Sequence, residues 1–376
     1  MKRHFMSSCF RLSFREILLI LLMQFALKGV SQSDKPSSGI ELKTHYGFLM
    51  PHHEYMLKLN QQHFPIFQFS YFREGDHGFG WQKLYRFPQH GISVVWSPLS
   101  SPDYLGQGLA VMPFVNFRMI KQKKFSTSFF VGAGLGYIEK PFDMRENYKN
   151  QAIGSRFNAA MMVQLEMKYR LSDFASLSCG ASLTHFSNGK AKTPNLGINN
   201  AGFFAGYSQY FPLKKNVTER KDNVFYNNED KWEKNIFFAT AIKQNYPVGG
   251  KSYLYTNWSF NIKRIYSPKG KFGAGIDIVY DFSDKAHFEM QGSDESSILF
   301  AKPAIYGLYD FRLGRTSVFM HLGTYLYAYE KNQNVGMIYD RVGIQFYISK
   351  SISAIVALKT HYAKADCIEW AVNYSF

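Results

Sequence analysis

Short stretches in which apolar and polar residues alternate run along most of the chain, and turn residues separate them. The side chains of a β-strand point alternately to its two faces, so this alternation predicts strands with one apolar face. We predict sixteen strands, eight on each side of a polar, charged stretch at 213–233. The first eight lie at 63–73, 78–87, 90–98, 105–119, 125–138, 156–171, 174–187 and 199–212, and the other eight at 234–245, 252–265, 272–284, 298–312, 315–328, 337–349, 351–362 and 367–376.

The two faces of the predicted strand at 174–187 differ in polarity. One face is apolar from Ala175 to Leu183, whereas the other carries mostly small, polar residues. His185 and Ser187 continue the apolar face at the end of the strand. In a soluble protein that face would pack in the core, whereas in an outer-membrane barrel it would face lipid. The ends of the chain and its composition distinguish between these two interpretations.

The two ends of the chain favour the membrane barrel. Residues 1–31 resemble a secretory signal peptide, because basic residues precede an apolar run too short to span a bilayer and small residues follow it. Cys9 precedes the apolar run, so a lipoprotein cleavage site is not expected. At the other end, Trp370 and the terminal Phe376 share one face of an alternating strand. This ending resembles the assembly signal of bacterial outer-membrane proteins, so the barrel-assembly machinery is an expected partner during biogenesis.

Composition agrees with a barrel rather than with membrane helices. Aromatic residues make up 17% of the chain, and no segment after residue 31 has the long apolar run of a membrane helix. Aromatic girdles and weakly alternating strands are typical of transmembrane β-barrels. We therefore expect an all-β, antiparallel transmembrane β-barrel in the bacterial outer membrane after signal-peptide cleavage. Sixteen strands would close as one large barrel or as two barrels of eight. A secreted, soluble β-sandwich is the alternative.

The chain is basic, with a formal net charge of +16. Five basic residues and one acidic residue within 1–31 account for +4 of this, so the mature chain would carry +12. This excess suits an anionic membrane surface such as phosphorylated lipid A. Nucleic acid is not an expected partner, because the basic residues are scattered among turns. Cys179 and Cys367 remain after cleavage, but Cys179 lies on the apolar face, so no disulfide is expected.

The two sets of strands resemble a diverged internal repeat. The expected organisation is an N-terminal segment at 32–62, a first repeat at 63–212, a linker at 213–233 and a second repeat at 234–376. The similar segments are 91–98 with 261–268, 105–109 with 272–276, and 183–187 with 359–363. The last pair keeps a histidine, His361, but has Ala363 in place of Ser187, so the second repeat is expected to be inactive. Chance similarity among aromatic, glycine-rich strands is the alternative.

Turn lengths predict which end of the barrel faces out of the cell. Outer-membrane barrels have short periplasmic turns and longer external loops. The strand at 174–187 is the seventh and would run outward, since the link before it is very short and the link at 188–198 is longer. His185 and Ser187 are therefore expected at the outer rim, facing the outer leaflet. The stretch at 213–233 is long for a periplasmic turn, which a linker between repeats would explain.

A histidine and a serine share one face of this strand, because residues i and i+2 point the same way. His185 should thus be close enough to take the hydroxyl proton of Ser187, the first requirement of an activated serine nucleophile. The string His185-Phe186-Ser187-Asn188-Gly189, followed by Pro194-Asn195-Leu196-Gly197, resembles the outer-membrane lipid A 3-O-deacylases of the PagL type, which are acyloxyacyl hydrolases. The resemblance covers about 63–212. The alternative is a polar patch in the aromatic belt.

The resemblance implies an esterase that removes the ester-linked acyl chain at position 3 of lipid A, within lipopolysaccharide, without a cofactor. Ser187 would be the nucleophile and His185 its general base. Asn188 and a backbone N–H near Gly189 would stabilise the oxyanion. Acyl transfer needs these parts, because an ester carbonyl requires a nucleophile, a base within reach and donors aimed at the developing charge.

One position departs from the family pattern, which has a glutamate fourteen residues after the histidine to orient it. This chain has Asn199 there. An amide holds an imidazole tautomer but stabilises the imidazolium less than a carboxylate does. Asn200 is a second candidate for this role, and Glu369 is a remote one. The departure keeps a second function open, a non-enzymatic outer-membrane barrel that acts as a pore or a structural protein and is a degenerate deacylase.

Two further groups of residues have weaker interpretations. Lys190 and Lys192 flank the site, where they would either meet a lipid A phosphate or simply be solvated. His52 and His53, near His63, could bind a metal ion, but a solvated loop is the expected role and no metal is predicted.

Overall fold

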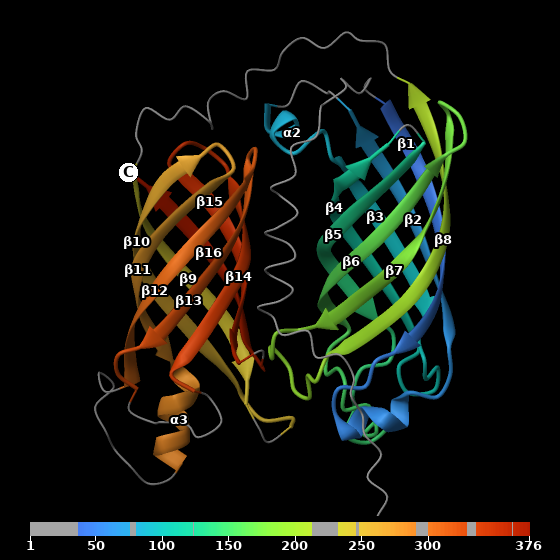
Figure 1. The fold of residues 1–376 in the computed structure, drawn as a ribbon. Helices are drawn as coiled ribbons and strands as arrows, with labels where there is room; N and C mark the ends of the chain where they lie inside the picture. Colours follow the sequence, from blue (N-terminus) through green and yellow to red (C-terminus); the bar gives the residue numbers. More distant parts are fainter. Residues whose placement is uncertain are drawn as a thin grey trace, which may run out of the picture. The chain divides into compact units, whose positions relative to one another are not determined.

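The chain folds into two closed antiparallel barrels of eight strands each (Figure 1). The computed structural model describes residues 37–75, 80–122, 124–212, 232–245, 248–290, 300–328, 336–362 and 364–376. The predicted signal peptide at 1–31 and all but the last two residues of the predicted linker at 213–233 lie outside them. The all-β prediction is confirmed, and of the two closures left open, two small barrels are found rather than one large one.

The first barrel closes by pairing its first strand with its last, β1 (Ser37–Leu49) with β8 (Ile198–Pro212). Strands that follow each other in sequence are neighbours in the sheet. Between β1 and β8 the strands are β2 (Phe64–Glu74), β3 (Gln89–Pro98), β4 (Gln107–Lys121), β5 (Phe125–Ile138), β6 (Phe157–Arg170) and β7 (Ala175–Ser187).

The second barrel closes in the same way, with β9 (Trp232–Gln244) paired to β16 (Lys364–Ser375). Its other strands are β10 (Ser252–Ser267), β11 (Gly270–Asp281), β12 (Ala301–Leu313), β13 (Thr316–Tyr325), β14 (Ile338–Tyr347) and β15 (Ile352–His361). The alternation of the last strand is as predicted: Trp370, Val372 and Tyr374 are exposed, whereas Ala371 and Asn373 between them are buried.

In both barrels most apolar side chains of the strands point outward and most polar side chains point inward, the reverse of a soluble protein. In β2, Phe67, Phe69 and Tyr71 lie on the outer face and are each more than 40% exposed, while Gln68 and Ser70 are buried inside. Large apolar side chains would be costly in water at this exposure, but they match a hydrocarbon surrounding. The apolar face of the strands is therefore the outer, lipid-type face, and the soluble β-sandwich interpretation is wrong.

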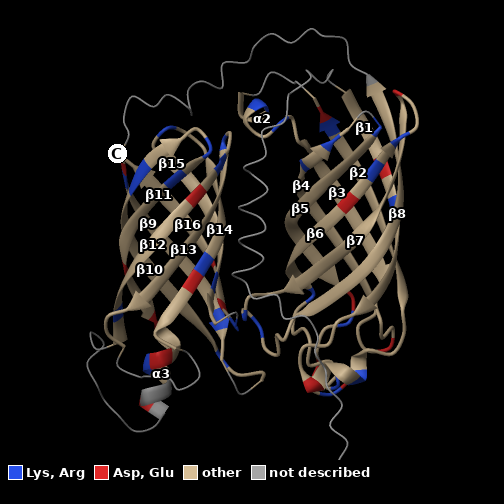
Figure 2. Ribbon diagram, in the orientation of Figure 1, with Lys and Arg blue, Asp and Glu red and all other residues tan. Residues whose placement is uncertain are grey.

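Basic and acidic residues lie on the strands of both barrels (Figure 2), and several of their side chains form ion pairs in the interior. In the first, the Lys43 ammonium lies 2.9 Å from Glu41 and 2.5 Å from Glu166. In the second, Arg341 donates to Asp277 over 3.0 Å and to Glu369 over 2.6 Å. Eight strands leave an interior just wide enough for side chains to fill. These buried ion pairs occupy the space that an open channel would need.

Two predictions for the N-terminal third are wrong. The segment at 32–62 contains β1 and a 3-10 helix, η1 (Glu54–Leu59), whereas the strand predicted at 78–87 is replaced by a short helix, α2 (Gly80–Leu84). Arg86 and Phe87 follow α2 with φ of 60° and 54°, which no strand residue adopts. Because one strand is gained and one is lost, the strand ending at Ser187 is still the seventh.

Smaller differences occur in the second half. The strand predicted at 272–284 ends at Asp281 and continues as a helix, α3 (Phe282–Met290). Of the paired repeat segments, 91–98 lies on the third strand of its barrel, whereas 261–268 lies mainly on the second strand of the other. No helix in the described part of the chain is long and apolar enough to cross a membrane.

The links between strands are longer at one end of the first barrel. At the end where β7 stops, the links are 50–63, 99–106, 139–156 and 188–197. At the opposite end, the links at 122–124 and 171–174 are short, and the third, at 75–88, contains α2. Four loops thus surround the end of β7, the place where the sequence predicts the reactive residues.

Candidate active site

His185 and Ser187 lie at the end of β7 on the outer face of the first barrel. Their cross-strand partners on β6 are Met161 and Ala159. Leu183 and Met161 beside them are 39% and 42% exposed, so the surrounding outer surface is apolar. The face shared with the apolar residues of β7 is thus the one predicted. On this face His185 is partly exposed, whereas Ser187 is buried.

His185 is held from the neighbouring strand. In the register of β7 and β8 it stands directly opposite Asn199, and its Nδ1 lies 2.6 Å from Asn199 Oδ1. An amide oxygen only accepts hydrogen bonds, so Nδ1 carries the proton. The other ring nitrogen, Nε2, is then left with its lone pair, which is the state a general base needs.

Of the three candidates for orienting His185, Asn199 makes the contact. Asn200 is the wrong alternative, because the next residue of a strand points to the opposite face, and here its side chain is buried on the inner side of the barrel. Glu369 belongs to the second barrel, where its carboxylate binds Arg341 and Tyr255. It serves that interior network.

Ser187 is buried to 8% exposure, and its oxygen receives two hydrogen bonds from the following loop. The Gly189 N–H donates over 3.2 Å, and Asn195 Nδ2 donates over 2.9 Å. Asn195 is oriented in turn, because its Oδ1 accepts from the Asn188 N–H over 3.1 Å. Among the described residues no hydrogen bond joins Ser187 to His185. With its lone pairs engaged by donors, the hydroxyl has its proton free to donate.

The side chain of Asn188 is turned away from the serine. Its Nδ2 donates to Ser155 Oγ over 2.7 Å and to the Lys192 carbonyl over 2.9 Å. In this arrangement Asn188 braces the loop, and Asn195 supplies the side-chain donor near Ser187. The sequence contained a signal for this, because Asn195 lies in the string Pro194-Asn195-Leu196-Gly197, but nothing in its spacing assigned it a role. The oxyanion role of Asn188 stays a prediction.

The loop at 188–197 needs glycine where it passes the histidine. Gly197 has a φ of +82°, which favours glycine, and a Cβ added there would lie 2.7 Å from His185 Cε1. Gly189 has a φ of +58°, so the chain turns sharply just after the serine and aims its N–H back at Ser187 Oγ. Glycine is therefore favoured at both positions by the positive φ, and at Gly197 also by the lack of space for a side chain.

The two lysines of this loop differ in exposure. Lys192 is exposed, whereas Lys190 is half-buried. Burial lowers the pKa of the Lys190 amine below its ordinary value. Lys192 is consequently the better placed of the two to meet an anionic group in solvent. Contact of either lysine with a phosphate stays a prediction.

A second residue that the sequence did not assign to the site is His52, in the link between β1 and β2. Its Nδ1 lies 3.0 Å from Asn199 Nδ2, and its Nε2 lies 2.8 Å from the Leu196 carbonyl oxygen. His53 instead accepts from the Tyr55 N–H, and His63 stacks on Tyr46. The three histidines have separate partners, and no group of three or more metal-ligating side chains occurs among the described residues.

The described residues of the second barrel form no equivalent of this arrangement. His361 ends β15 but lies on the inner face, where its Nδ1 is 3.0 Å from the Ile338 carbonyl and its Nε2 is 3.5 Å from Asp366. The link to β16 is two residues long, 362–363, and Ala363 lies outside the described residues. Segments 183–187 and 359–363 are therefore similar in sequence, but His185 points out of its barrel and His361 points into its barrel.

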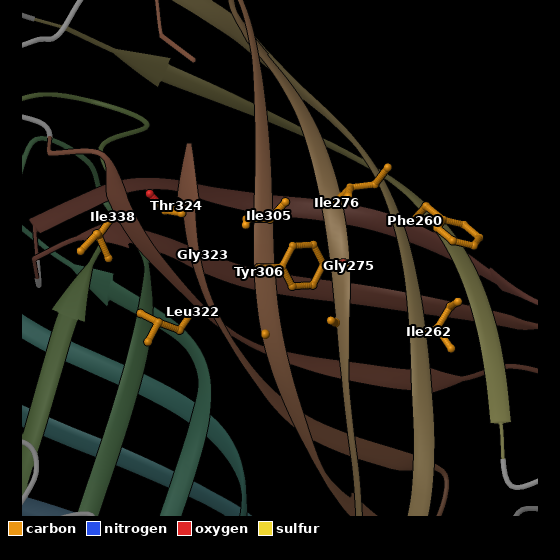
Figure 3. Close-up of a pocket in the computed structure, with 12 residues that line it drawn as sticks. Phe260, Ile262, Gly275, Ile276, Ile305, Tyr306, Leu322, Gly323, Thr324 and Ile338 are labelled. Carbon is orange, nitrogen blue, oxygen red and sulfur yellow. The ribbon is translucent and has the colours of Figure 1, made fainter. Parts of the chain in front are cut away.

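A groove of about 670 Å³ lies on the outer face of the second barrel, between β10 and β14 (Figure 3). It is lined mainly by aliphatic residues such as Ile262, Ile276 and Leu322, and Gly307 leaves space in its floor. The described residues that line it include no histidine, carboxylate, lysine or cysteine. Despite its size, the groove carries no acyl-transfer chemistry, and the candidate site remains the end of β7.

Solved structures resemble the fold only loosely. Neisserial surface protein A is 9% identical, with 47% of this chain and 100% of that chain covered and a TM-score of 0.34. CdiB from Acinetobacter baumannii is 8% identical, with 90% and 60% covered and a TM-score of 0.18. A mutant porin of Rh. blastica is 9% identical, with 91% and 100% covered and a TM-score of 0.18. At this level the likenesses carry no argument about function.

The family comparisons are more specific. No curated protein matches the chain. The family model of the acyloxyacyl hydrolase C-terminal domain matches residues 232–376, the whole second barrel. The family model of lipid A 3-O-deacylase (PagL) matches residues 67–208, which include every residue around Ser187 described above except His52. Most of the chain is thus matched, and the chain belongs to the lipid A 3-O-deacylase (PagL) family, with an acyloxyacyl hydrolase C-terminal domain as its second barrel.

Proposed function

We propose that this protein is an outer-membrane esterase that removes the acyl chain ester-linked at position 3 of lipid A. The observation that carries the proposal is the arrangement at the end of β7. There Ser187 receives two donors, and His185 is held by Asn199 with Nε2 unprotonated, both on a lipid-type face. This segment also lies inside the part of the chain that the deacylase family matches.

In the proposed reaction, Ser187 Oγ attacks the ester carbonyl and its proton passes to His185 Nε2. The attack converts the carbonyl group into a tetrahedral intermediate, in which the former carbonyl oxygen carries the negative charge. The donors that reach Oγ in the resting enzyme, Asn195 Nδ2 and the Gly189 N–H, are close enough to bind that oxyanion. His185 then gives its proton to the leaving sugar oxygen, and water hydrolyses the acyl-serine by the reverse proton transfers.

The reaction requires His185 Nε2 to approach Ser187. Catalytic hydrogen bonds are often long in the absence of substrate and tighten in the complex. Both residues are on the same strand face, so a rotation of side chains brings them together without a change in the barrel. Asn199 keeps Nδ1 occupied throughout and so preserves the reactive tautomer.

The location of the site fits a lipid substrate. Exposed apolar side chains lie around the pair, among them Met161, Leu183 and Phe203. Acyl chains in the membrane would lie along this surface, while the loops at the end of β7 meet the sugar and its phosphates. We place this end at the outer leaflet, after secretion with signal-peptide cleavage and insertion by the barrel-assembly machinery. The pore alternative has less support, because buried ion pairs fill both interiors.

Mass spectrometry of lipid A tests the function. Lipid A from cells that express the protein should lose the mass of one hydroxyacyl chain relative to lipid A from cells that lack it. Unchanged lipid A in cells whose outer membrane contains the folded barrel would contradict the proposal. Conductance of planar bilayers that contain the purified protein would then support the pore instead.

A further inference from the structure

We propose that His52 is a positioning residue, which acts through Asn199 to hold His185 in the tautomer that accepts a proton. The inference rests on the proposed function, in which His185 is the general base. It assigns a role to a residue of the link between β1 and β2, outside the range matched by the deacylase family.

The barrel brings His52 to the site by strand pairing. β1 and β8 are neighbours, and Leu49 at the end of β1 is opposite Asn200 near the start of β8. The Met50 N–H continues the pairing and donates to the Asn199 carbonyl over 2.8 Å. The link therefore leaves the barrel directly beside Asn199, and His52 follows two residues later.

The Leu196 carbonyl determines the donor and the acceptor in both hydrogen bonds of the His52 ring. The Leu196 oxygen only accepts, so the His52 Nε2 that lies 2.8 Å from it must carry a proton. In a neutral imidazole the other nitrogen, Nδ1, is then an acceptor. It faces an Asn199 group at 3.0 Å, which must be the donating NH₂. His52 thus selects which end of the Asn199 amide points toward it.

The same selection fixes His185. With NH₂ committed to His52, the amide oxygen of Asn199 faces His185 Nδ1 at 2.6 Å and requires a proton there. An asparagine alone has two orientations of similar shape, which differ only in which atom it presents. The flipped orientation would offer NH₂ to Nδ1, place the proton of His185 on Nε2 and leave no base for Ser187. A glutamate at this position would need no such selector, because both of its oxygens accept.

A double-mutant cycle tests the role of His52, with full-length protein in detergent micelles and purified lipid A as the substrate. His52→Ala should lower kcat about tenfold with KM nearly unchanged, since one ordinary hydrogen bond that orients the base is lost. In an Asn199→Glu background the same change should alter kcat less than about twofold, because the carboxylate orients His185 directly. His52→Gln, which keeps one acceptor and one donor, should retain most of the activity.

Two controls separate this role from simple support of the loop. His53→Ala, the neighbouring exposed histidine with other partners, should leave kcat unchanged. Heat-modifiable gel mobility verifies that each variant is a folded barrel. An equal loss from His52→Ala in both backgrounds would overturn the proposal, since a loop-supporting residue does not depend on what stands at 199. No loss in the native background would overturn it as well.

A spectroscopic measurement remains informative if the proposed function itself fails. Imidazole ¹⁵N chemical shifts, assigned to His185 with a His185→Ala sample, report which nitrogen carries the proton. The native protein should show a proton on Nδ1, and His52→Ala should show a mixture of the two tautomers. An unchanged Nδ1–H tautomer in His52→Ala would contradict the proposal whether or not the protein releases acyl chains.

Discussion

The two hairpins that end the barrels, β7–β8 and β15–β16, resemble each other in sequence but differ in two structural respects. His185 points out of the first barrel toward Asn199, whereas His361 points into the second barrel toward Ile338 and Asp366. The first hairpin is joined by the ten residues 188–197 and the second by the two residues 362–363.

The comparison shows that the barrel alone does not make the site. In the first hairpin the loop returns two donors, from Gly189 and Asn195, to the oxygen of Ser187. A link of two residues cannot fold back in this way on its own strand. In the proposed mechanism the outward phase of the strand places the histidine and serine on the lipid side, and the loop supplies the polar donors that acyl transfer requires.

The largest expected difference between the hairpins is that between their histidines. His185→Ala should lower kcat by about 10³-fold or more, because a serine without its base is a weak nucleophile and the two act as a unit. His361→Ala should change kcat less than about twofold, since it lies inside the other barrel. The measurement is hydroxyacyl release from lipid A by purified, folded protein. A large loss from His361→Ala would mean that the site has been placed in the wrong hairpin.

Substitution of Asn195 tests what the loop at 188–197 contributes to catalysis. Asn195→Ala removes the side-chain donor nearest Ser187 and should lower kcat by about 10²-fold, as expected when one oxyanion donor is lost. Asn188→Ala should cost less and act through KM and stability, because its amide bonds the loop to Ser155 rather than to the serine. Steady-state kinetics and thermal unfolding of both variants separate the two effects. The reverse ranking in kcat would restore the oxyanion role predicted for Asn188.

A steric prediction compares two glycines. Gly197→Ala should lower kcat about tenfold, because the new Cβ would lie 2.7 Å from the His185 ring at a φ that disfavours alanine. Gly307→Ala on the second barrel is the matched control, since its Cβ would meet nothing within 4 Å. Equal kinetics for the two variants would show that the close packing of His185 against the loop has no functional importance.

The smallest changes concern the residue that orients His185. Asn199→Ala should lower kcat about tenfold through the loss of one hydrogen bond. Asn199→Glu should raise kcat by up to about tenfold, because a carboxylate stabilises the imidazolium that forms during attack. Lipid A hydrolysis measured with both variants decides this point. A fall in activity for the glutamate variant would show that the native site depends on the amide.

Much of the fold could be predicted from alternation, because the lipid-type face and the interior differ in polarity along almost every strand. The sequence does not predict the first strand, β1, because Glu41 and Lys43 obscure its alternation of apolar and polar residues. These charges are buried, and their partners, Glu166 and Lys168, are more than a hundred residues away. Helix α2 was mistaken for a strand, because a short apolar run does not reveal its local conformation.

Less of the site could be predicted. The positions of His185 and Ser187 on one outer face, and of Asn199 opposite, follow from strand periodicity and spacing. The contribution of Asn195 depends on how a ten-residue loop folds back, and that of His52 depends on closure of β1 against β8. The similarity between His185 and His361 was misleading, because a period of two gives the same sequence pattern for the inward and the outward face.

Lipid A mass spectra from cells that express Ser187→Ala test most directly whether Ser187 is the nucleophile. The variant removes one oxygen at the rim and no interior packing, so the barrel should assemble normally and keep its heat-modifiable mobility. Native protein should remove one hydroxyacyl chain from lipid A, and Ser187→Ala should leave lipid A intact. Loss of the same hydroxyacyl chain in cells that express the folded Ser187→Ala barrel would show that Ser187 is not the nucleophile.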